Sequence, residues 1–174
     1  TPEQALVNAV RLMQEGGSMM VKLEGNEGQL RVVEYLAKHD IPVCAHLGLK
    51  PQSVHKIGGF KVQGRDNAIA KKMAQDAKTL QSAGADIILL ECVPNEVGQN
   101  ITKLVDVPVI GIGAGPHVDG QILVLYDVLG ITQGRLPRFV KNFMDGSESP
   151  LAALGAYVNA VKTGTYPAKE HCFS

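Results

Sequence analysis

Residues 85–94, ADIILLECVP, decide the fold class of this chain. Apolar side chains occupy consecutive positions from Ile87 to Leu90, so both faces of an extended strand would be apolar. The preceding segment, 66–84, has helical spacing and ends at Gly84, a common helix stop signal. A helix followed by a strand that is apolar on both faces is typical of a parallel sheet in an α/β protein.

The same alternation continues on both sides of this unit. The sequence therefore predicts one domain, 1–174, built on a parallel sheet with helices between the strands. The long segment 49–65 is expected to be a loop, and the C-terminal part to hold a helix pair within 136–167. The expected helices lie at 1–17, 27–40, 66–84 and 95–104, and the expected strands at 19–24, 41–48, 85–94, 107–115 and, less regularly, 121–130.

Composition indicates an ordinary globular protein. The 17 Lys and Arg residues balance 17 Asp and Glu residues, so no net charge favours nucleic acid or an anionic membrane as partner. No apolar run reaches the roughly 20 residues of a membrane-spanning helix. The three cysteines form neither a CxxC motif nor a zinc-binding pattern, which favours a reducing, cytoplasmic setting.

Polar residues gather where the expected strands end. Lys22 and Glu24 end the first strand and, being two apart, lie on the same face. His46 ends the second strand and Glu91 the third. Ligand sites of parallel α/β folds lie at the carboxyl ends of the strands, so we expect a functional site here.

Three of these residues also have a structural interpretation. Lys22 and Glu24 could form an ion pair that fixes strand packing. His46 could be a hydrogen-bonded structural histidine. Glu91, at the end of an apolar strand, suits the role of a general base.

Two further motifs carry weaker signals. The glycines of GIGAG (111–115) resemble a dinucleotide fingerprint, but the third required glycine is replaced by Pro116. We expect them to let a ligand or a neighbouring side chain approach the backbone. The basic loop 49–65 is expected to be a solvated lid, with contact to an anionic cosubstrate as the alternative.

Several longer segments resemble the ketopantoate hydroxymethyltransferase family. They follow the family's order over essentially the whole chain: MVKLEG (20–25), IPVCAHLGLKPQSVHKIGGFKVQGR (41–65), LLECVP (89–94), VPVIGIGAG (107–115), DGQILVLYDVLGI (119–131), KNF (141–143) and the YP and EH pairs near the end. The resemblance implies a (β/α)₈ TIM barrel, of which this chain carries about the last five strand–helix units. Two magnesium-binding aspartates and a substrate-binding serine of the family belong to the first three strands. We therefore expect the chain to be part of a longer protein.

The resemblance also implies roles for the residues at the strand ends. Lys22 and His46 would bind the substrate, Glu24 would serve a Mg²⁺ site, and Glu91 would be the catalytic base. The implied reaction transfers a hydroxymethyl group from 5,10-methylenetetrahydrofolate to 3-methyl-2-oxobutanoate, giving 2-dehydropantoate for pantothenate and coenzyme A biosynthesis. The family forms homo-oligomers, namely decamers.

Two other hypotheses remain open. Phosphoenolpyruvate mutases and isocitrate lyases are also Mg²⁺-dependent barrels that act on oxo acids, but they use no folate. Alternatively, the chain could be an inactive assembly fragment whose apolar helices after Leu136 form subunit contacts.

Overall fold

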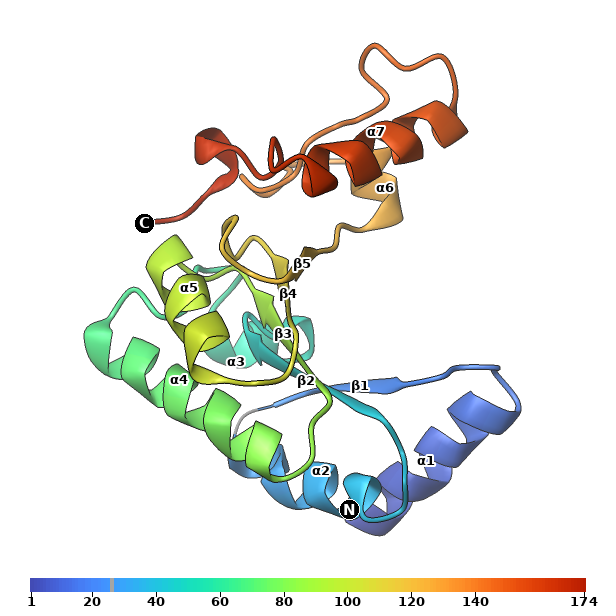
Figure 1. Ribbon diagram of the computed structural model, residues 1–174, viewed down its shortest axis with the longest axis vertical. Helices are drawn as coiled ribbons and strands as arrows, with labels where there is room; N and C mark the ends of the chain where they lie inside the picture. Colours follow the sequence, from blue (N-terminus) through green and yellow to red (C-terminus); the bar gives the residue numbers. More distant parts are fainter. Residues whose placement is uncertain (26) are drawn as a thin grey trace.

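A five-stranded parallel sheet forms the centre of the protein (Figure 1). The computed structural model describes residues 1–25 and 27–174. Strand order follows chain order, and each strand pairs in parallel with the next. The strands are β1 (Val21–Glu24), β2 (Val43–Gly48), β3 (Ile87–Glu91), β4 (Val109–Ile112) and β5 (Gly120–Gln121). This strand order confirms the expected segment of a (β/α) barrel, in which the strands are also neighbours in the order of the chain.

Helices connect the strands and pack along one side of the sheet. Figure 1 shows α2, α4 and α5 together on that side, and α7 near the C-terminal end. The helices are α1 (Pro2–Gln14), α2 (Leu30–Ala37), α3 (Val54–Ile57), α4 (Asn67–Ser82), α5 (Asn95–Leu104), α6 (Leu125–Val128) and α7 (Pro150–Lys162), with short 3₁₀ turns η1 (Glu27–Gln29), η2 (Pro51–Ser53) and η3 (Lys169–His171). Within the described residues, no helix combines the length and apolar character needed to cross a membrane.

Local signals in the sequence fix where the helices begin and end. Thr1 and Gln4 form a capping box at the start of α1. At α4 the Asp66 carboxylate accepts hydrogen bonds from the N–H groups of Ala68 and Ile69. Gly84 follows this helix with φ of 102°, a left-handed conformation that glycine adopts without strain.

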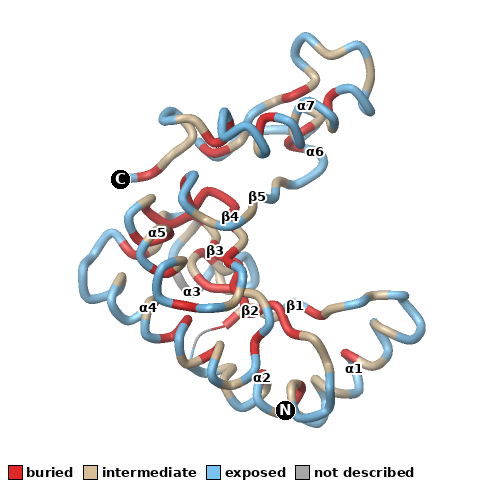
Figure 2. Tube along the Cα trace, viewed as in Figure 1, coloured by how far each residue is buried: buried red, intermediate tan, exposed pale blue. Residues whose placement is uncertain are grey.

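The two faces of the sheet have different partners. Leu23, Ala45 and Ile88 lie in one row across β1, β2 and β3 and belong to the core beneath the helices. Figure 2 shows the buried positions concentrated along the central strands. The opposite face carries Lys22, Cys44 and Ile87 in one row. A second apolar cluster that includes Leu89, Ile112, Phe139 and Phe173 covers part of this face.

Aspartates hold the amino ends of two strands. The Asp86 side chain, just before β3, accepts a hydrogen bond of 2.8 Å from the Val43 N–H at the start of β2. Asp119, just before β5, accepts an equal hydrogen bond from the Val109 N–H at the start of β4. In both cases the connection that leads into one strand satisfies an unpaired N–H of its neighbour.

The structure corrects the expected fifth strand. Of the stretch 121–130, only Gln121 belongs to a strand, and Leu125–Val128 forms the helix α6. The chain leaves the sheet after the Ile122 N–H donates to the Gly111 carbonyl, and Val124 is exposed. An apolar run without clear period does not distinguish a strand from a short helix, which is why the prediction was wrong.

Two further expectations need smaller corrections. The expected helix pair within 136–167 is a single helix, α7, because the segment before it packs through Phe143 against Val128 and Tyr166 without helical structure. The Phe143 N–H donates to the Val128 carbonyl and ties this segment to α6. The expected loop 49–65 contains the short helical turns η2 and α3.

Candidate active site

Three of the four predicted site residues lie in a diagonal row on one face of the sheet, and this row reaches the carboxyl end of β3 at Glu91. Lys22 on β1, His46 on β2 and Glu91 on β3 come from adjacent strands. The Lys22 Nζ lies 3.4 Å from His46 Nδ1, and His46 Nε2 lies 3.2 Å from Glu91 Oε2. The imidazole therefore bridges an amine and a carboxylate, and we call these three residues the Lys–His–Glu row.

Burial differs along the Lys–His–Glu row. His46 has no exposed surface, the Glu91 side chain is 16% exposed, and Lys22 is exposed. His46 Nε2 is close to the Glu91 carboxylate but lacks the alignment of a hydrogen bond, so it is an unsatisfied buried polar atom. The row thus presents a carboxylate and an amine to the surface and keeps the imidazole behind them.

Glu24 lies on the same face but has a different partner. It shares this face with Lys22, as their spacing predicts, and it is opposite His46 in the strand register. Its Oε2 accepts a hydrogen bond of 3.0 Å from the Gln52 N–H at η2. Among the described residues, Lys22 and Glu24 do not pair with each other, so the alternative of a structural ion pair between them is wrong.

The described residues do not form a magnesium site by themselves. In this part of the chain, no three or more His, Cys, Asp and Glu side chains come together in a group able to hold a metal ion. Mg²⁺ requires near-octahedral oxygen coordination, and Glu24 offers one carboxylate that already accepts a backbone N–H. The role of Glu24 as a metal ligand stays a prediction.

Sequence reasoning missed two cysteines near the Lys–His–Glu row. Cys44 lies two residues before His46, a spacing that places both on one face of β2. Burial raises the pKa of the Cys44 thiol to about 11, although the charge of Lys22 acts in the opposite direction. Burial also raises the pKa of Cys92 to about 11, and the negative charge of Glu91 adds to this effect. Both thiols are therefore neutral near pH 7 and unsuited to nucleophilic attack.

Glycines near the site serve close packing of protein groups. Gly48 lies opposite Glu91, and a Cβ atom at Gly48 would collide with the Glu91 carbonyl. Gly113 is in contact with the Phe139 ring, and Gly115 with the Asn95 side chain. The GIGAG glycines thus let neighbouring side chains approach the backbone, which was one of the two alternatives for this motif.

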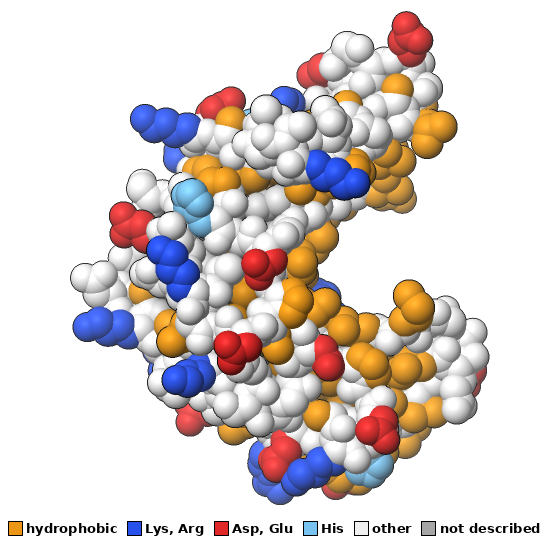
Figure 3. Space-filling view, in the orientation of Figure 1, with side chains coloured by type: hydrophobic (Ala, Val, Ile, Leu, Met, Phe, Trp, Pro, Cys, Tyr) orange, Lys and Arg blue, Asp and Glu red, His pale blue; other side chains and the backbone are white. Residues whose placement is uncertain are grey.

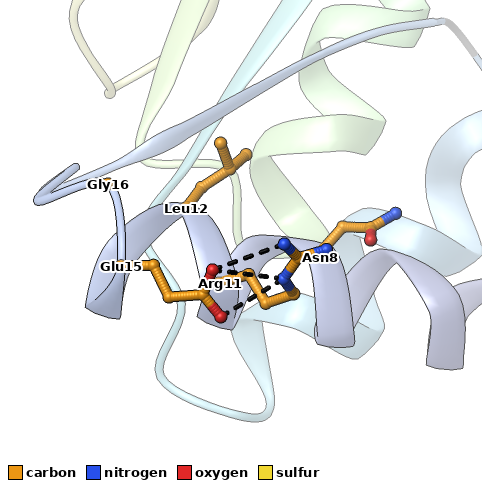
Figure 4. A pocket seen from close by; sticks show the side chains of 5 residues that line it. All are labelled: Asn8, Arg11, Leu12, Glu15 and Gly16. Carbon is orange, nitrogen blue, oxygen red and sulfur yellow. Dashed lines mark hydrogen bonds and ion pairs between the residues drawn. The ribbon is translucent and has the colours of Figure 1, made fainter.

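A surface hollow lies away from these residues. It has a volume of about 520 Å³ and runs along α1 (Figure 4). Its lining includes the exposed ion pair of Arg11 and Glu15, at 3.3 Å, and no residue of the Lys–His–Glu row. Functional groups converge at the strand ends and not in this hollow, so the site is assigned to the strand ends. The residues that line the hollow are Asn8, Arg11, Leu12, Glu15 and Gly16.

Comparison of the sequence with known proteins links this chain to one enzyme family. Residues 1–169 match the family model described as ketopantoate hydroxymethyltransferase. A 3-methyl-2-oxobutanoate hydroxymethyltransferase of Alkalilimnicola ehrlichii is 59% identical, over 99% of this chain and 62% of that protein. The protein of the same name from Halorhodospira halophila is 57% identical over 98% of this chain and 62% of that protein. The chain thus spans about three fifths of the length of these relatives.

Proposed function

Because this chain belongs to the ketopantoate hydroxymethyltransferase family, we propose that the protein transfers a hydroxymethyl group to 3-methyl-2-oxobutanoate. The donor in this proposal is 5,10-methylenetetrahydrofolate, and the product is 2-dehydropantoate, a precursor for pantothenate and coenzyme A biosynthesis. The observation that carries the proposal is the Lys–His–Glu row, which combines a carboxylate base at the carboxyl end of β3 with a cation on the same face of the sheet.

The proposed first step is removal of a proton from the substrate. 3-Methyl-2-oxobutanoate carries one hydrogen on C3, next to its carbonyl group. The Glu91 carboxylate is partly exposed and free to accept this proton as a general base. The exposed Lys22 ammonium stabilises the negative charge that develops on the substrate oxygen.

The proposed second step forms the new carbon–carbon bond. C3 of the enolate attacks the methylene carbon of the folate, whose carbon–nitrogen bonds break in turn. Water supplies the hydroxyl group and one proton, and the two nitrogens of the departing folate take up this proton and the proton removed from C3. The family resemblance also supports Mg²⁺ as cofactor, with Glu24 as a candidate ligand, but the described residues bring no group of three potential ligands together and we assign no step to a metal.

The proposal also covers the cellular location, the oligomeric state and the small-molecule partners of the protein. We place it in the cytoplasm, supported by the free, buried thiols of Cys44 and Cys92, which suit a reducing compartment. We propose a homo-oligomer, the decamer that the family resemblance implies. Its small-molecule partners would be the oxo acid and the folate.

Exchange of the C3 hydrogen in D₂O tests the role of Glu91. We expect Glu91→Gln to bind 3-methyl-2-oxobutanoate but to exchange its C3 hydrogen about 10²- to 10⁴-fold more slowly, because an amide cannot accept the proton. Proton NMR of the substrate measures the exchange rate. The matched control is Glu96→Gln at the exposed start of α5, which should exchange like the wild type. Full exchange by Glu91→Gln would remove Glu91 from this role.

Product formation separates the proposed reaction from the other oxo-acid barrels. We expect 2-dehydropantoate to form only when 5,10-methylenetetrahydrofolate is present. Cleavage or rearrangement of an oxo acid without folate would instead favour the phosphoenolpyruvate mutase and isocitrate lyase group.

A further inference from the structure

The two nitrogens of His46 face groups of opposite charge. Nδ1 lies 3.4 Å from the Lys22 ammonium, and Nε2 lies 3.2 Å from the Glu91 carboxylate. The ring has no exposed surface and sits on β2, between two paired strands. Its position is therefore fixed by the sheet, and its surface is not available to a substrate.

The neighbours of His46 determine where its proton lies. A lysine ammonium can only donate, so Nδ1 must be the acceptor of this contact and carry no proton. A neutral imidazole then has its single proton on Nε2, which faces Glu91. The opposite tautomer would direct an N–H at the ammonium and a lone pair at the carboxylate, and both contacts would be repulsive.

The short Nε2 to Oε2 distance needs only a small adjustment to become a hydrogen bond. The pair is close at 3.2 Å but misaligned. The terminal torsion of a glutamate side chain has a broad energy profile, so a rotation of the carboxylate costs little. Hydrogen bonds between catalytic groups are often poorly aligned in ligand-free proteins and tighten when substrate binds.

We propose that His46 is a positioning residue that holds the Glu91 carboxylate through its Nε2–H and is itself oriented by Lys22. This inference rests on the proposed function, because it assigns Glu91 as the base. It replaces the direct substrate contact that the family resemblance implies for His46. One oxygen of Glu91 accepts from His46, which leaves the other oxygen to take the proton from the substrate.

The tautomer of His46 can be observed without any reaction. We expect long-range proton–nitrogen NMR spectra of ¹⁵N-histidine-labelled protein to show a protonated Nε2 and an unprotonated Nδ1 for this residue. The signals are assigned by their loss in His46→Gln, since the chain contains four other histidines besides His46. A proton on Nδ1 alone would overturn the proposal.

Two amide substitutions distinguish the roles of the two ring nitrogens of His46. The side-chain NH₂ of glutamine lies near the position of Nε2, whereas that of asparagine lies near Nδ1. We therefore expect His46→Gln to retain most of the C3–H exchange rate at saturating substrate. His46→Asn should lose about 10²-fold in this rate, the cost of a misplaced catalytic group, while the half-saturating substrate concentration changes little.

The outcomes distinguish this inference from the proposed function. If the wild-type protein exchanges C3–H but both amide variants are equally slow, or if either mainly raises the half-saturating concentration, His46 does not act by positioning Glu91. If the wild type shows no exchange, the proposed function fails, and the NMR spectrum still decides how His46 is bonded. Circular dichroism and urea unfolding show whether each variant is folded.

Discussion

At the scale of single residues, the turn after Glu91 has an unusual backbone conformation. Cys92 has φ of 54°, in the left-handed region that non-glycine residues seldom adopt. Two backbone hydrogen bonds hold it there, from its N–H to the Ile112 carbonyl and from the Gln63 N–H to its carbonyl. Such a conformation costs on the order of 1–3 kcal/mol and often occurs at functional sites. Here it ends β3 directly after the proposed base.

The raised thiol pKa of Cys44 gives a pH-dependent stability. Burial raises this pKa from an ordinary value of 9.0 to about 11, so between these values the unfolded chain loses a proton that the folded chain keeps. The free energy of unfolding should therefore fall with rising pH in this window, by at most about 1.4 kcal/mol per pH unit for one thiol. Urea unfolding from about pH 8 to about pH 12 measures it.

Comparison with Cys44→Ala isolates this contribution from lysines and tyrosines, which titrate in the same range. The difference in free energy of unfolding between wild type and variant should be constant below pH 9.0. Between pH 9.0 and about pH 11 the wild type should lose stability relative to the variant. A difference that is independent of pH would show that the thiol titrates normally in the folded protein.

Residue identities were easier to predict than their contacts. The spacing of Lys22 and Glu24 predicted a shared face, and strand ends predicted that Lys22, His46 and Glu91 would meet. The separate partner of Glu24, the Gln52 N–H, depends on how the loop folds over the sheet. Loop geometry is set by tertiary contacts, which spacing within one strand does not encode.

At the scale of elements, the aspartates at the amino ends of the strands are a repeated stabilising feature. Asp86→Ala should lower the free energy of unfolding by about 1–2 kcal/mol, because it leaves the Val43 N–H without its partner beside a buried strand. Asp86→Asn is the matched control, since an amide oxygen can still accept this hydrogen bond. Urea midpoints of both variants measure the effect, and equal midpoints for Asp86→Ala and wild type would contradict it.

Helices and strands were predicted well where the apolar residues have a clear pattern and the sequence also marks where the element begins and ends. The expected helix 66–84 is α4, Asn67–Ser82, and the expected strand 85–94 contains β3, Ile87–Glu91. The stretch 121–130 lacked such signals, and its side chains partly face solvent. The apolar residues of this stretch are not buried in the sheet. The sequence pattern alone could therefore not show whether the stretch forms a strand or a helix.

At the scale of the whole molecule, the sheet has two outer strands, β1 and β5, each paired on one side only within the described residues. Exposed apolar side chains lie beside both, Met19 just before β1 and Ile122 and Val124 just after β5. Figure 3 shows hydrophobic side chains along the hollowed side of the molecule, between the C-terminal segment and α1. Unpaired strand edges with nearby apolar surface favour association.

The chain of 174 residues should therefore associate in a concentration-dependent way. Sedimentation velocity should show a larger average mass at higher concentration, and the double substitution Ile122→Lys and Val124→Lys should reduce it, because charges disfavour pairing at the β5 edge. The control is Leu151→Lys on α7, an exposed apolar position outside the sheet edges. If all three proteins sediment as monomers at every concentration, the edges do not cause association.

The order of the strands also determines when each strand can pair during synthesis. Because β1 to β5 are neighbours in the sheet in the same order as in the chain, the partner of each new strand has already left the ribosome when that strand emerges. The sheet can therefore grow by addition at one edge during synthesis. The lysine, the histidine and the glutamate would be assembled in that sequence, and the Lys–His–Glu row would be formed once β3 has docked.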